Sequence, residues 1–423
     1  MKVLVVGSGG REHAIAAAFS RSEHMPLMFC APGNAGIAAV AECVNISADD
    51  VNALAEFAAR NAIDLTFVGG ESPLALGISD EFAARGLRMV GVSKAAARLE
   101  ASKAFAKDLM QRHNIPTAKY KVAASPDEAV AILHSGYFGG EDAAVVVKAD
   151  GLAAGKGVVV ADDRAAAISA INDLASLVGA EAAATIVLEE CLYGKELSLI
   201  LFSDGENFAL MPPTRDHKRI GEGDTGPNTG GMGTFTDDTL LTDEAKNAIV
   251  ETIIKPTLKG CADEGFPFRG IMFLGLMMTA DGAKVLEYNV RFGDPETQSI
   301  LVRLKTDLVD ICNAVIDGTL ADLAIEWRKG SSATVVLAAE GYPASPRKGD
   351  AISGIGDAAA MKDVSVFHAG TARNESGEFI TAGGRVLGVT ATDETLSGAL
   401  EKTYAAVEKI SWNGMQFRRD IGK

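Results

Sequence analysis

The first hundred residues alternate short apolar runs with helical patterns, and this alternation constrains the fold more than any other feature. KVLVVG is typical of a strand and REHAIAAAFSRS of a helix, and such pairs repeat as far as LRMVGVS. Apolar strands that alternate with helices form a parallel sheet covered on both faces. The sequence therefore predicts an α/β, doubly wound domain over residues 1–102. Its strand ends carry the turns GSGG, APGNAG and GGESP, where such folds bind ligands.

The remaining three quarters of the chain require more than one hydrophobic core, because 423 residues exceed what a single core serves. Strand and helix patterns over 125–190 predict a small separate unit, the lid. We expect a central domain to be built around this lid from residues 103–124 and 191–325. The patterns over 326–423 predict a compact α+β cap.

Charge and cysteine usage exclude several classes of protein. The net charge of −16 argues against a general nucleic-acid binder, which would carry a basic face. No apolar run approaches the roughly 20 residues of a membrane helix, and MKVLVVGSGG is typical of a first strand and not of a signal peptide. Five scattered cysteines without a C-x-x-C pair indicate reduced thiols. We therefore predict a cytoplasmic protein that binds neither nucleic acid nor a membrane.

The stretch EYNVRFGDPETQ, residues 287–298, carries the strongest chemical signal. On a strand, Glu287 and Asn289 project from the same face, and two oxygen ligands side by side suit a hard divalent cation such as Mg²⁺. The guanidinium of Arg291 can bind a carboxylate or phosphate through two N–H groups, and the acids Asp294 and Glu296 follow it. Together they indicate phosphoryl transfer onto a small polar substrate, although each residue alone is also compatible with a solvated strand end.

The glycine turn GSGG after the first strand is a poor dinucleotide fingerprint. Glu12 occupies the position of the third glycine, and the acidic ribose anchor is missing from FCAPG. A glycine turn that feeds a helix can still present backbone N–H groups to a phosphate. The turn therefore favours a sugar phosphate or similar anion over a nicotinamide cofactor, with a purely structural turn as the alternative.

A second glycine loop, KADGLAAGKG over residues 148–157, resembles a P-loop without its spacing. Only three residues separate its glycines, and Gly157 stands where Ser or Thr would follow the lysine. We expect a hairpin that closes over a triphosphate, with Lys148 neutralising charge and loop amides covering phosphates. A simple glycine hairpin with a surface lysine is the alternative.

Two further segments are compatible with nucleotide binding. In TIVLEECLYGKE, the strand end at Glu189 could border an adenine pocket, with a carboxylate accepting from the exocyclic amine and Glu196 facing ribose hydroxyls. Paired glutamates are also common at solvated strand ends. The charged run RDHKR precedes DTGPNTGGMG, a loop that could approach phosphates or act as a lid, or could simply be solvated.

Taken together, the motifs resemble one family over essentially the whole chain. GGREHA, APGNAG, LEASKAF, VKADGLAAGKGV, DHKR, DTGPNTGGMG and EYNVRFGDPETQ are similar, in this order, to the glycinamide ribonucleotide synthetases, ATP-grasp enzymes of de novo purine synthesis. The resemblance implies an ATP-grasp fold with the lid as one subdomain. It also implies that ATP drives ligation of glycine to 5-phosphoribosylamine through glycyl phosphate, with Mg²⁺ or alternatively Mn²⁺ as the metal. The expected state is a monomer or weak homodimer.

The resemblance also implies residue roles. Contacts to ATP would come from Lys103, Lys148, Gly155, Lys156, Gly157, Glu189, Leu192 and Glu196, and the metal would be held by Glu287 and Asn289. Arg291 would grip the glycine carboxylate, with Asp216, Asp294 and Pro295 near its amine end. The residues facing phosphoribosylamine would be Gly9, Gly10, Asn34, Gly36 and Glu71. The catalytic set would be Arg291, Asp294, Asp216 and Lys148.

Some positions depart from the family pattern, and other functions stay open. Ser8 replaces a usual Asn, Gly70 a common Pro, and Arg215 a frequent Gln, which would add positive charge beside the presumed glycine site. The strand GIMFLGLMM lacks a metal-binding carboxylate found in many ATP-grasp enzymes. The alternatives are a carboxylate–amine ligase for another acid, a nicotinamide-dependent oxidoreductase and a non-catalytic nucleotide-binding scaffold.

Overall fold

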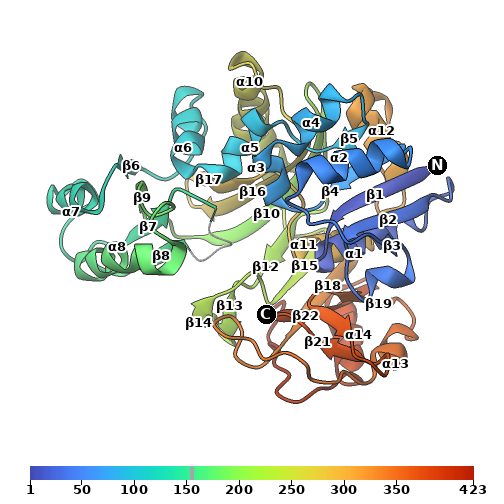
Figure 1. Cartoon of the computed structure of the whole chain (residues 1–423). Helices are drawn as coiled ribbons and strands as arrows, with labels where there is room; N and C mark the ends of the chain where they lie inside the picture. The colour runs from blue at the N-terminus through green and yellow to red at the C-terminus, as the bar shows by residue number, and fades with distance from the viewer. Residues whose placement is uncertain (153–156) are drawn as a thin grey trace.

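The computed structural model describes residues 1–152 and 157–423 (Figure 1). Its N-terminal part is a parallel five-stranded sheet of order β3-β2-β1-β4-β5. The strands are β1 (Lys2–Gly7), β2 (Leu27–Pro32), β3 (Glu42–Cys43), β4 (Leu65–Val68) and β5 (Met89–Val90). The surrounding helices are α1 (Gly10–Phe19), η1 (Ile37–Ala39), α2 (Val51–Arg60), α3 (Glu71–Leu76), α4 (Ile78–Ala84) and α5 (Lys94–Ala101).

The central strand of this sheet is buried on both faces. Leu4 and Val6 pack into one hydrophobic cluster and Val3 and Val5 into another on the opposite face. Each such buried side chain stabilises the fold by about 1.5–3 kcal/mol. The doubly wound α/β architecture predicted from the strand–helix alternation is confirmed.

The lid is a four-stranded antiparallel sheet of order β6-β9-β7-β8, which projects to one side of the body in Figure 1. Its elements are β6 (Tyr120–Ala123), α7 (Pro126–His134), β7 (Val145–Ala149), β8 (Val158–Ala161), α8 (Arg164–Val178) and β9 (Ile186–Glu190). It has its own apolar core, which includes Val147, Ile171 and Leu188.

A large antiparallel sheet lies in the rest of the body, with the main path β17-β16-β10-β12-β15-β18-β22-β19. Its strands are β10 (Lys195–Asp204), β11 (Phe208–Leu210), β12 (Thr214–Asp216), β15 (Gly233–Asp237), β16 (Arg269–Thr279), β17 (Gly282–Asn289), β18 (Ser331–Ala338), β19 (Val364–His368) and β22 (Arg385–Asp393). Small hairpins are formed by β13 (Arg219–Gly221) with β14 (Thr225–Asn228) and by β20 (Thr371–Arg373) with β21 (Phe379–Thr381). Strand β15 precedes residue 326 and pairs with β18, which follows it, so one sheet contains strands from both sides of the expected domain boundary. The domain limits stay a prediction.

Helices cover the large sheet. They are α6 (Lys103–Arg112), α9 (Asp243–Ile249), the π-helical turn η2 (Val250–Ile254), α10 (Lys255–Asp263), α11 (Glu296–Leu301), α12 (Leu308–Asp317), η3 (Leu320–Asp322), α13 (Ile355–Ala359) and α14 (Leu396–Val407). A search of the described helices finds no segment of the length and hydropathy needed to cross a bilayer. All five cysteines are free thiols, as the sequence predicts.

Candidate active site

Where the lid meets the body, two lysines hold one buried carboxylate. Lys148 on β7 contacts Oε1 of Glu189 on β9 at 2.7 Å, and Lys107 on α6 contacts Oε2 at 2.8 Å. Burial opposes ionisation of Glu189, but the charges of Lys148 and Lys107 outweigh it and hold its pKa below the usual value. The side chain thus holds lysines, whereas the sequence suggests an acceptor for an adenine amine. Contact of Glu189 with ATP stays a prediction.

Both lysines of this cluster are connected to β17 by hydrogen bonds. Lys148 Nζ donates to the carbonyl of Leu286 at 3.1 Å. Lys107 Nζ donates to Thr117 Oγ1 at 2.7 Å, and that hydroxyl donates to the carbonyl of Val285. Sequence reasoning missed Lys107. The available signal was its position four residues after Lys103, which places both on one helix face.

The predicted metal ligands lie at the end of β17. A register irregularity near Gly275 leaves Glu287 opposite that glycine and Asn289 opposite Phe273. A Cβ at Gly275 would lie 3.1 Å from Glu287 Cγ, so the missing side chain on β16 gives the carboxylate room. Burial would raise the pKa of Glu287, but Lys218, Lys148 and Lys103 surround it and hold its pKa low. A carboxylate and an amide oxygen on one face suit a hard divalent cation.

The other predicted ATP residues border the same region. Lys103 Nζ donates to the carbonyl of Gly151 at 3.3 Å, and the Lys218 ammonium lies 3.3 Å from Glu196 and 4.0 Å from Glu287. Leu192 follows β9, and Gly157 accepts a hydrogen bond from Ala149 N–H. Gly155 and Lys156, also predicted to contact ATP, lie outside the described residues.

Arg291 follows β17, and protein acceptors surround its guanidinium. Nε donates to Glu71 Oε2 at 3.1 Å, and Nη2 donates to Glu100 Oε1 at 2.7 Å and to Asn289 Oδ1 at 3.2 Å. Nη1 donates to the carbonyl of Phe292 at 3.2 Å. Glu71 begins α3 in the N-terminal domain, so Arg291 joins two regions for which the sequence predicts different ligands. Glu100, on α5, was not predicted.

Asp216, at the end of β12, has a raised pKa, whereas the pKa of Glu189 is lowered. Its Oδ1 is buried and finds no hydrogen-bond partner within residues 1–152 and 157–423. Burial raises its pKa well above the usual range, and the nearby charge of Glu296 adds to this, opposed by Lys218 and Arg385. Glu296, at the start of α11, is also buried, and its pKa is raised by that burial. Sequence reasoning noted Glu296 as an acid of the motif but gave it no role.

Asp294 and Pro295 complete this side of the site. The Asp294 carboxylate pairs with Arg385 Nη2 at 3.0 Å and accepts from Gln298 Nε2 at 2.8 Å. A Cβ at Gly231, which has a φ of +107°, would lie 2.5 Å from Pro295 Cδ and 2.9 Å from Asp216 Oδ1. A glycine at this position lets the DTGPNTGGMG loop cover the acids, and Arg385 anchors the loop through the carbonyl of Gly230.

The N-terminal turn explains why Glu12 replaces a glycine. Its carboxylate accepts from Gly9 N–H at 2.6 Å and from Arg11 Nε at 2.6 Å. A Cβ at Gly7 or Gly69 would collide with the Glu12 side chain. Glu12 therefore holds the turn against β4, and Gly10 begins α1 beside Gln298.

Asn34 and Gly36 lie between the N-terminal turn and the C-terminal strands. Asn34 Nδ2 donates to the carbonyls of Ser8 (2.8 Å) and His368 (2.9 Å), while Oδ1 accepts from Gly36 and Ile37 N–H. A Cβ at Gly36 would overlap the ring of His368, so only glycine fits. Asn34 thus uses its side chain to hold loops together.

Arg215 does not add charge where the sequence suggested. It pairs with Phe235 across β12 and β15, and its guanidinium lies 5.9 Å from that ring's centroid. Side chains alternate along a strand, so Arg215 and Asp216 lie on opposite faces. The expectation of a positive charge beside the glycine site is corrected by this geometry.

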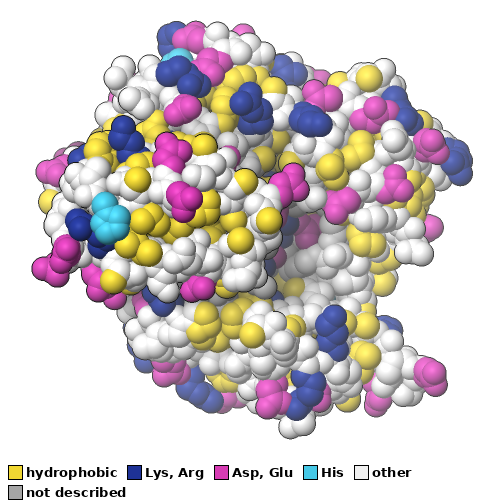
Figure 2. Space-filling view, turned by 60° about the vertical axis from the view of Figure 1, so that its left-hand side comes forward, with side chains coloured by type: hydrophobic (Ala, Val, Ile, Leu, Met, Phe, Trp, Pro, Cys, Tyr) yellow, Lys and Arg dark blue, Asp and Glu magenta, His cyan; other side chains and the backbone are white. Residues whose placement is uncertain are grey.

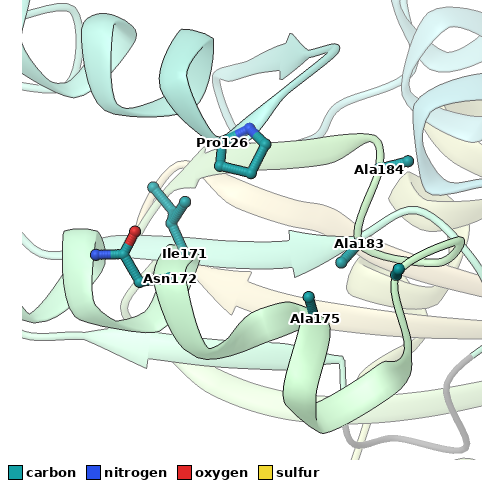
Figure 3. Close-up of a pocket in the computed structure, with 7 residues that line it drawn as sticks. Pro126, Ile171, Asn172, Ala175, Ala183 and Ala184 are labelled. Carbon is teal, nitrogen blue, oxygen red and sulfur yellow. The ribbon is translucent and has the colours of Figure 1, made fainter.

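On the face drawn in Figure 2, the molecule is hollowed between an upper and a lower lobe, with acidic side chains along the upper rim. A separate hollow lies inside the lid, between α7 and α8 (Figure 3). Its lining is Pro126, Ile171, Asn172, Ala175, Ala180, Ala183 and Ala184, without a charged group. It therefore offers nothing to a phosphorylated ligand.

Comparison with known proteins identifies the family. Profiles described as the N, ATP-grasp (A) and C domains of phosphoribosylglycinamide synthetase match residues 1–100, 101–297 and 332–423. The phosphoribosylamine–glycine ligase of Brucella melitensis is 46% identical over 422 residues, covering 100% of this chain and 97% of the relative. That of Vibrio parahaemolyticus is 47% identical over 426 residues, covering 100% and 98%.

Solved structures support the same family assignment. The Thermotoga maritima phosphoribosylamine–glycine ligase superposes with a TM-score of 0.83 at 34% identity, covering 100% of both chains. Campylobacter jejuni biotin carboxylase, with a TM-score of 0.71 at 16% identity over 98% of this chain and 92% of that one, shares the fold alone. The chain therefore belongs to the phosphoribosylglycinamide synthetase family and is an ATP-dependent ligase of the ATP-grasp fold.

Proposed function

We propose that the residues around the end of β17 join glycine to 5-phosphoribosylamine at the expense of ATP. The products are glycinamide ribonucleotide, ADP and phosphate, which is a step of purine biosynthesis. One observation carries the proposal: Glu287 lies 4.0 Å from Lys218, the charges of Lys148 and Lys103 also lower its pKa, and Asn289 beside it contacts Arg291. Ligation of this kind needs concentrated positive charge, an oxygen-rich metal seat and an anion fork, and that cluster supplies all three.

Lys103, Lys148 and Lys218 neutralise the triphosphate. Glu287 and Asn289 hold Mg²⁺, with Mn²⁺ as a substitute, and the ion when bound neutralises charge on the phosphate oxygens. Lys107 keeps Glu189 and hence Lys148 in place, because its ammonium occupies the second oxygen of the same carboxylate. Leu192, Glu196 and the loop that includes Gly155, Lys156 and Gly157 complete the nucleotide site.

The chemistry follows from the weakness of a carboxylate as an acyl donor. The glycine carboxylate attacks the γ-phosphorus, ADP leaves, and glycyl phosphate forms. The nitrogen of phosphoribosylamine then attacks the acyl carbon, loses a proton, and releases inorganic phosphate. Neither step uses a covalent enzyme intermediate, so the protein's contribution is positioning and charge neutralisation.

Glycine lies between two charged groups of opposite sign. Arg291 binds its carboxylate. Asp216 receives its ammonium group, since the buried and unpartnered Oδ1 of that residue needs a cationic donor. Asp294 and Pro295 border the same end, with Asp294 held by Arg385.

Phosphoribosylamine binds at the N-terminal turns. Gly9 and Gly10 lie at the start of α1, and the positive end of a helix dipole attracts a phosphate. Asn34 and Gly36 shape this site by fixing the loop, and Glu71 faces the amine. The protein acts in the cytoplasm as a monomer or weak homodimer without nucleic acid or membrane partners, which sedimentation of the purified chain would test.

Phosphate release tests the activity directly. Phosphoribosylamine generated in situ from ribose 5-phosphate and ammonia is added to Mg-ATP and glycine, and we expect release only when both substrates are present. Glu287→Gln should abolish turnover and leave the circular dichroism spectrum unchanged. Glu401→Gln, on the exposed face of α14, is the matched control. Release without glycine, or with another acid but not glycine, would overturn the proposal.

A further inference from the structure

We infer that Glu71 is an exchangeable partner of Arg291, and that this exchange couples the glycine site to the phosphoribosylamine site. The inference rests on the proposed function, which assigns the glycine carboxylate to Arg291. It adds a mechanism by which each substrate improves the binding of the other.

The starting point is the occupancy of the Arg291 guanidinium. Such a group has five N–H donors. Four hydrogen bonds, to Glu71, Glu100, Asn289 and the Phe292 carbonyl, engage it within the described part of the chain. A carboxylate held by a fork needs two adjacent donors. Nε–H and an N–H of Nη2 form one adjacent pair, and Glu71 occupies the single Nε–H, so bidentate binding of glycine through this pair requires that Glu71 leave.

Of the two carboxylates that hold Arg291, Glu71 is the more weakly bound. Glu100 is 8% exposed, contacts Arg291 at 2.7 Å, and is fixed by a second bond from Val290 N–H at 2.8 Å. Glu71 is 30% exposed and holds Arg291 through a single bond of 3.1 Å. Breaking the longer, more exposed bond costs less, because solvent can replace it.

Once released, Glu71 is a carboxylate placed for an amine. It begins α3 at the strand-end turns of the N-terminal sheet, where the proposed function puts phosphoribosylamine. Burial opposes its ionisation, but Arg291 and Arg11 hold its pKa at about 2, so it carries a full charge. An amine donor from phosphoribosylamine can replace the Arg291 donor. Glu71 thus exchanges one nitrogen donor for another.

Reciprocity follows from this exchange. Glycine that takes Arg291 frees Glu71 for the amine, and an amine that takes Glu71 frees Arg291 for glycine. The two affinities must then change by the same factor. A purely structural ion pair between Glu71 and Arg291 would produce no such coupling.

Removing the competing carboxylate should therefore tighten glycine binding. Calorimetric titration of glycine into the enzyme, with magnesium and a non-hydrolysable ATP analogue but without phosphoribosylamine, should show about five- to tenfold higher affinity in Glu71→Gln and in Glu71→Ala, as expected for a modest coupling. Glu56→Gln, an exposed glutamate of the same domain, should match the wild type. A gain in affinity is not expected from a damaged fold.

Steady-state turnover provides the second readout. In the wild type, the glycine KM should fall as phosphoribosylamine rises. In Glu71→Gln, it should be low throughout, while the KM for phosphoribosylamine rises at least tenfold. Unchanged or weaker glycine affinity in both variants, with wild-type turnover intact, would overturn the exchange. Absence of turnover in the wild type would instead overturn the proposed function.

Discussion

Two buried carboxyls of this enzyme, Glu189 and Asp216, have opposite surroundings. Glu189 lies between the ammonium groups of Lys148 and Lys107, and its pKa is lowered. Asp216 Oδ1 has no hydrogen-bond partner in the part of the chain that the structure describes, and its pKa is raised. A buried charge with its partners in place is structural, whereas a buried acceptor without one is a site that a ligand can complete.

The difference divides the site into a pre-assembled half and an incomplete half. On the nucleotide side, lysines and carboxylates are already paired, which fixes Lys148 before a ligand arrives. On the glycine side, Asp216 and Glu296 are both hard to ionise and lie near each other. A substrate ammonium would relieve that burden, so we predict that its pairing with Asp216 contributes much of the binding energy of glycine.

The largest expected effect is loss of stability in Glu189→Gln. Removing one charge from the cluster leaves two buried lysines without their counter-ion, which costs about 3–5 kcal/mol in free energy of unfolding. Urea denaturation would measure it. Glu190→Gln, next along the strand but more exposed, should change stability by less than about 1 kcal/mol.

Replacing Lys107 as well tests whether the charges are the cause. The double variant Lys107→Met with Glu189→Gln should recover part of the lost stability, because it leaves one buried lysine instead of two. A double variant no more stable than Glu189→Gln alone would contradict the counter-ion explanation.

Asp216→Asn should have the second largest effect, on activity and not on folding. Loss of a charged acceptor for the glycine ammonium should lower kcat/KM for glycine about a hundredfold, which corresponds to about 2.7 kcal/mol. Stability should stay equal or rise, because a buried carboxyl is removed. Asp281→Asn, in the turn between β16 and β17, is the control. Near-normal glycine kinetics in Asp216→Asn would remove this residue from the glycine site.

The pH dependence of stability should have opposite signs in the two variants. The pKa of Glu189 is lowered from 4.5, so its stabilising contribution is present above pH 4.5 and disappears as pH falls further. The pKa of Asp216 is raised from 3.8, so the wild type loses stability as pH rises above 3.8 while only the unfolded chain ionises. As pH rises from about 2.5 to 8, urea titrations should show Glu189→Gln becoming relatively less stable up to pH 4.5, and Asp216→Asn relatively more stable from pH 3.8 upward. Parallel trends would refute the contrast.

The sequence predicted the fold because local patterns encode it, and it named several residues that the structure brings together, whose roles stay a prediction. Strand–helix alternation determines the parallel sheet, and strand periodicity places Glu287 and Asn289 on one face. Lys107, Glu100 and Glu296 received no role because their partners are distant in the sequence. Lys107 meets Glu189 from another element, and Glu100 meets Arg291 across 191 residues. No local spacing reports such contacts.

The same limitation applies to loops. APGNAG suggested a ligand-binding turn, but the side-chain amide of Asn34 makes four hydrogen bonds within the protein, one of them to the carbonyl of residue 368. A glycine-rich motif predicts that another group lies close to the backbone, but it does not identify that group. For Gly36 the neighbour is the His368 ring, which only the tertiary structure supplies.

The smallest expected effect belongs to Arg215→Gln, which restores the residue that the family pattern suggests. If the guanidinium faced the glycine site, removing its charge would alter glycine affinity. Because the side chain instead lies over Phe235 on the opposite face of β12, we expect glycine KM to change less than about twofold and stability by less than about 1 kcal/mol, the size of an exposed cation–π contact. Glycine kinetics of the variant at low and high salt would check this. A large, salt-sensitive change in KM would mean that Arg215 shares the face of Asp216, and the contrast between Asp216 and Glu189 would then need a different electrostatic basis.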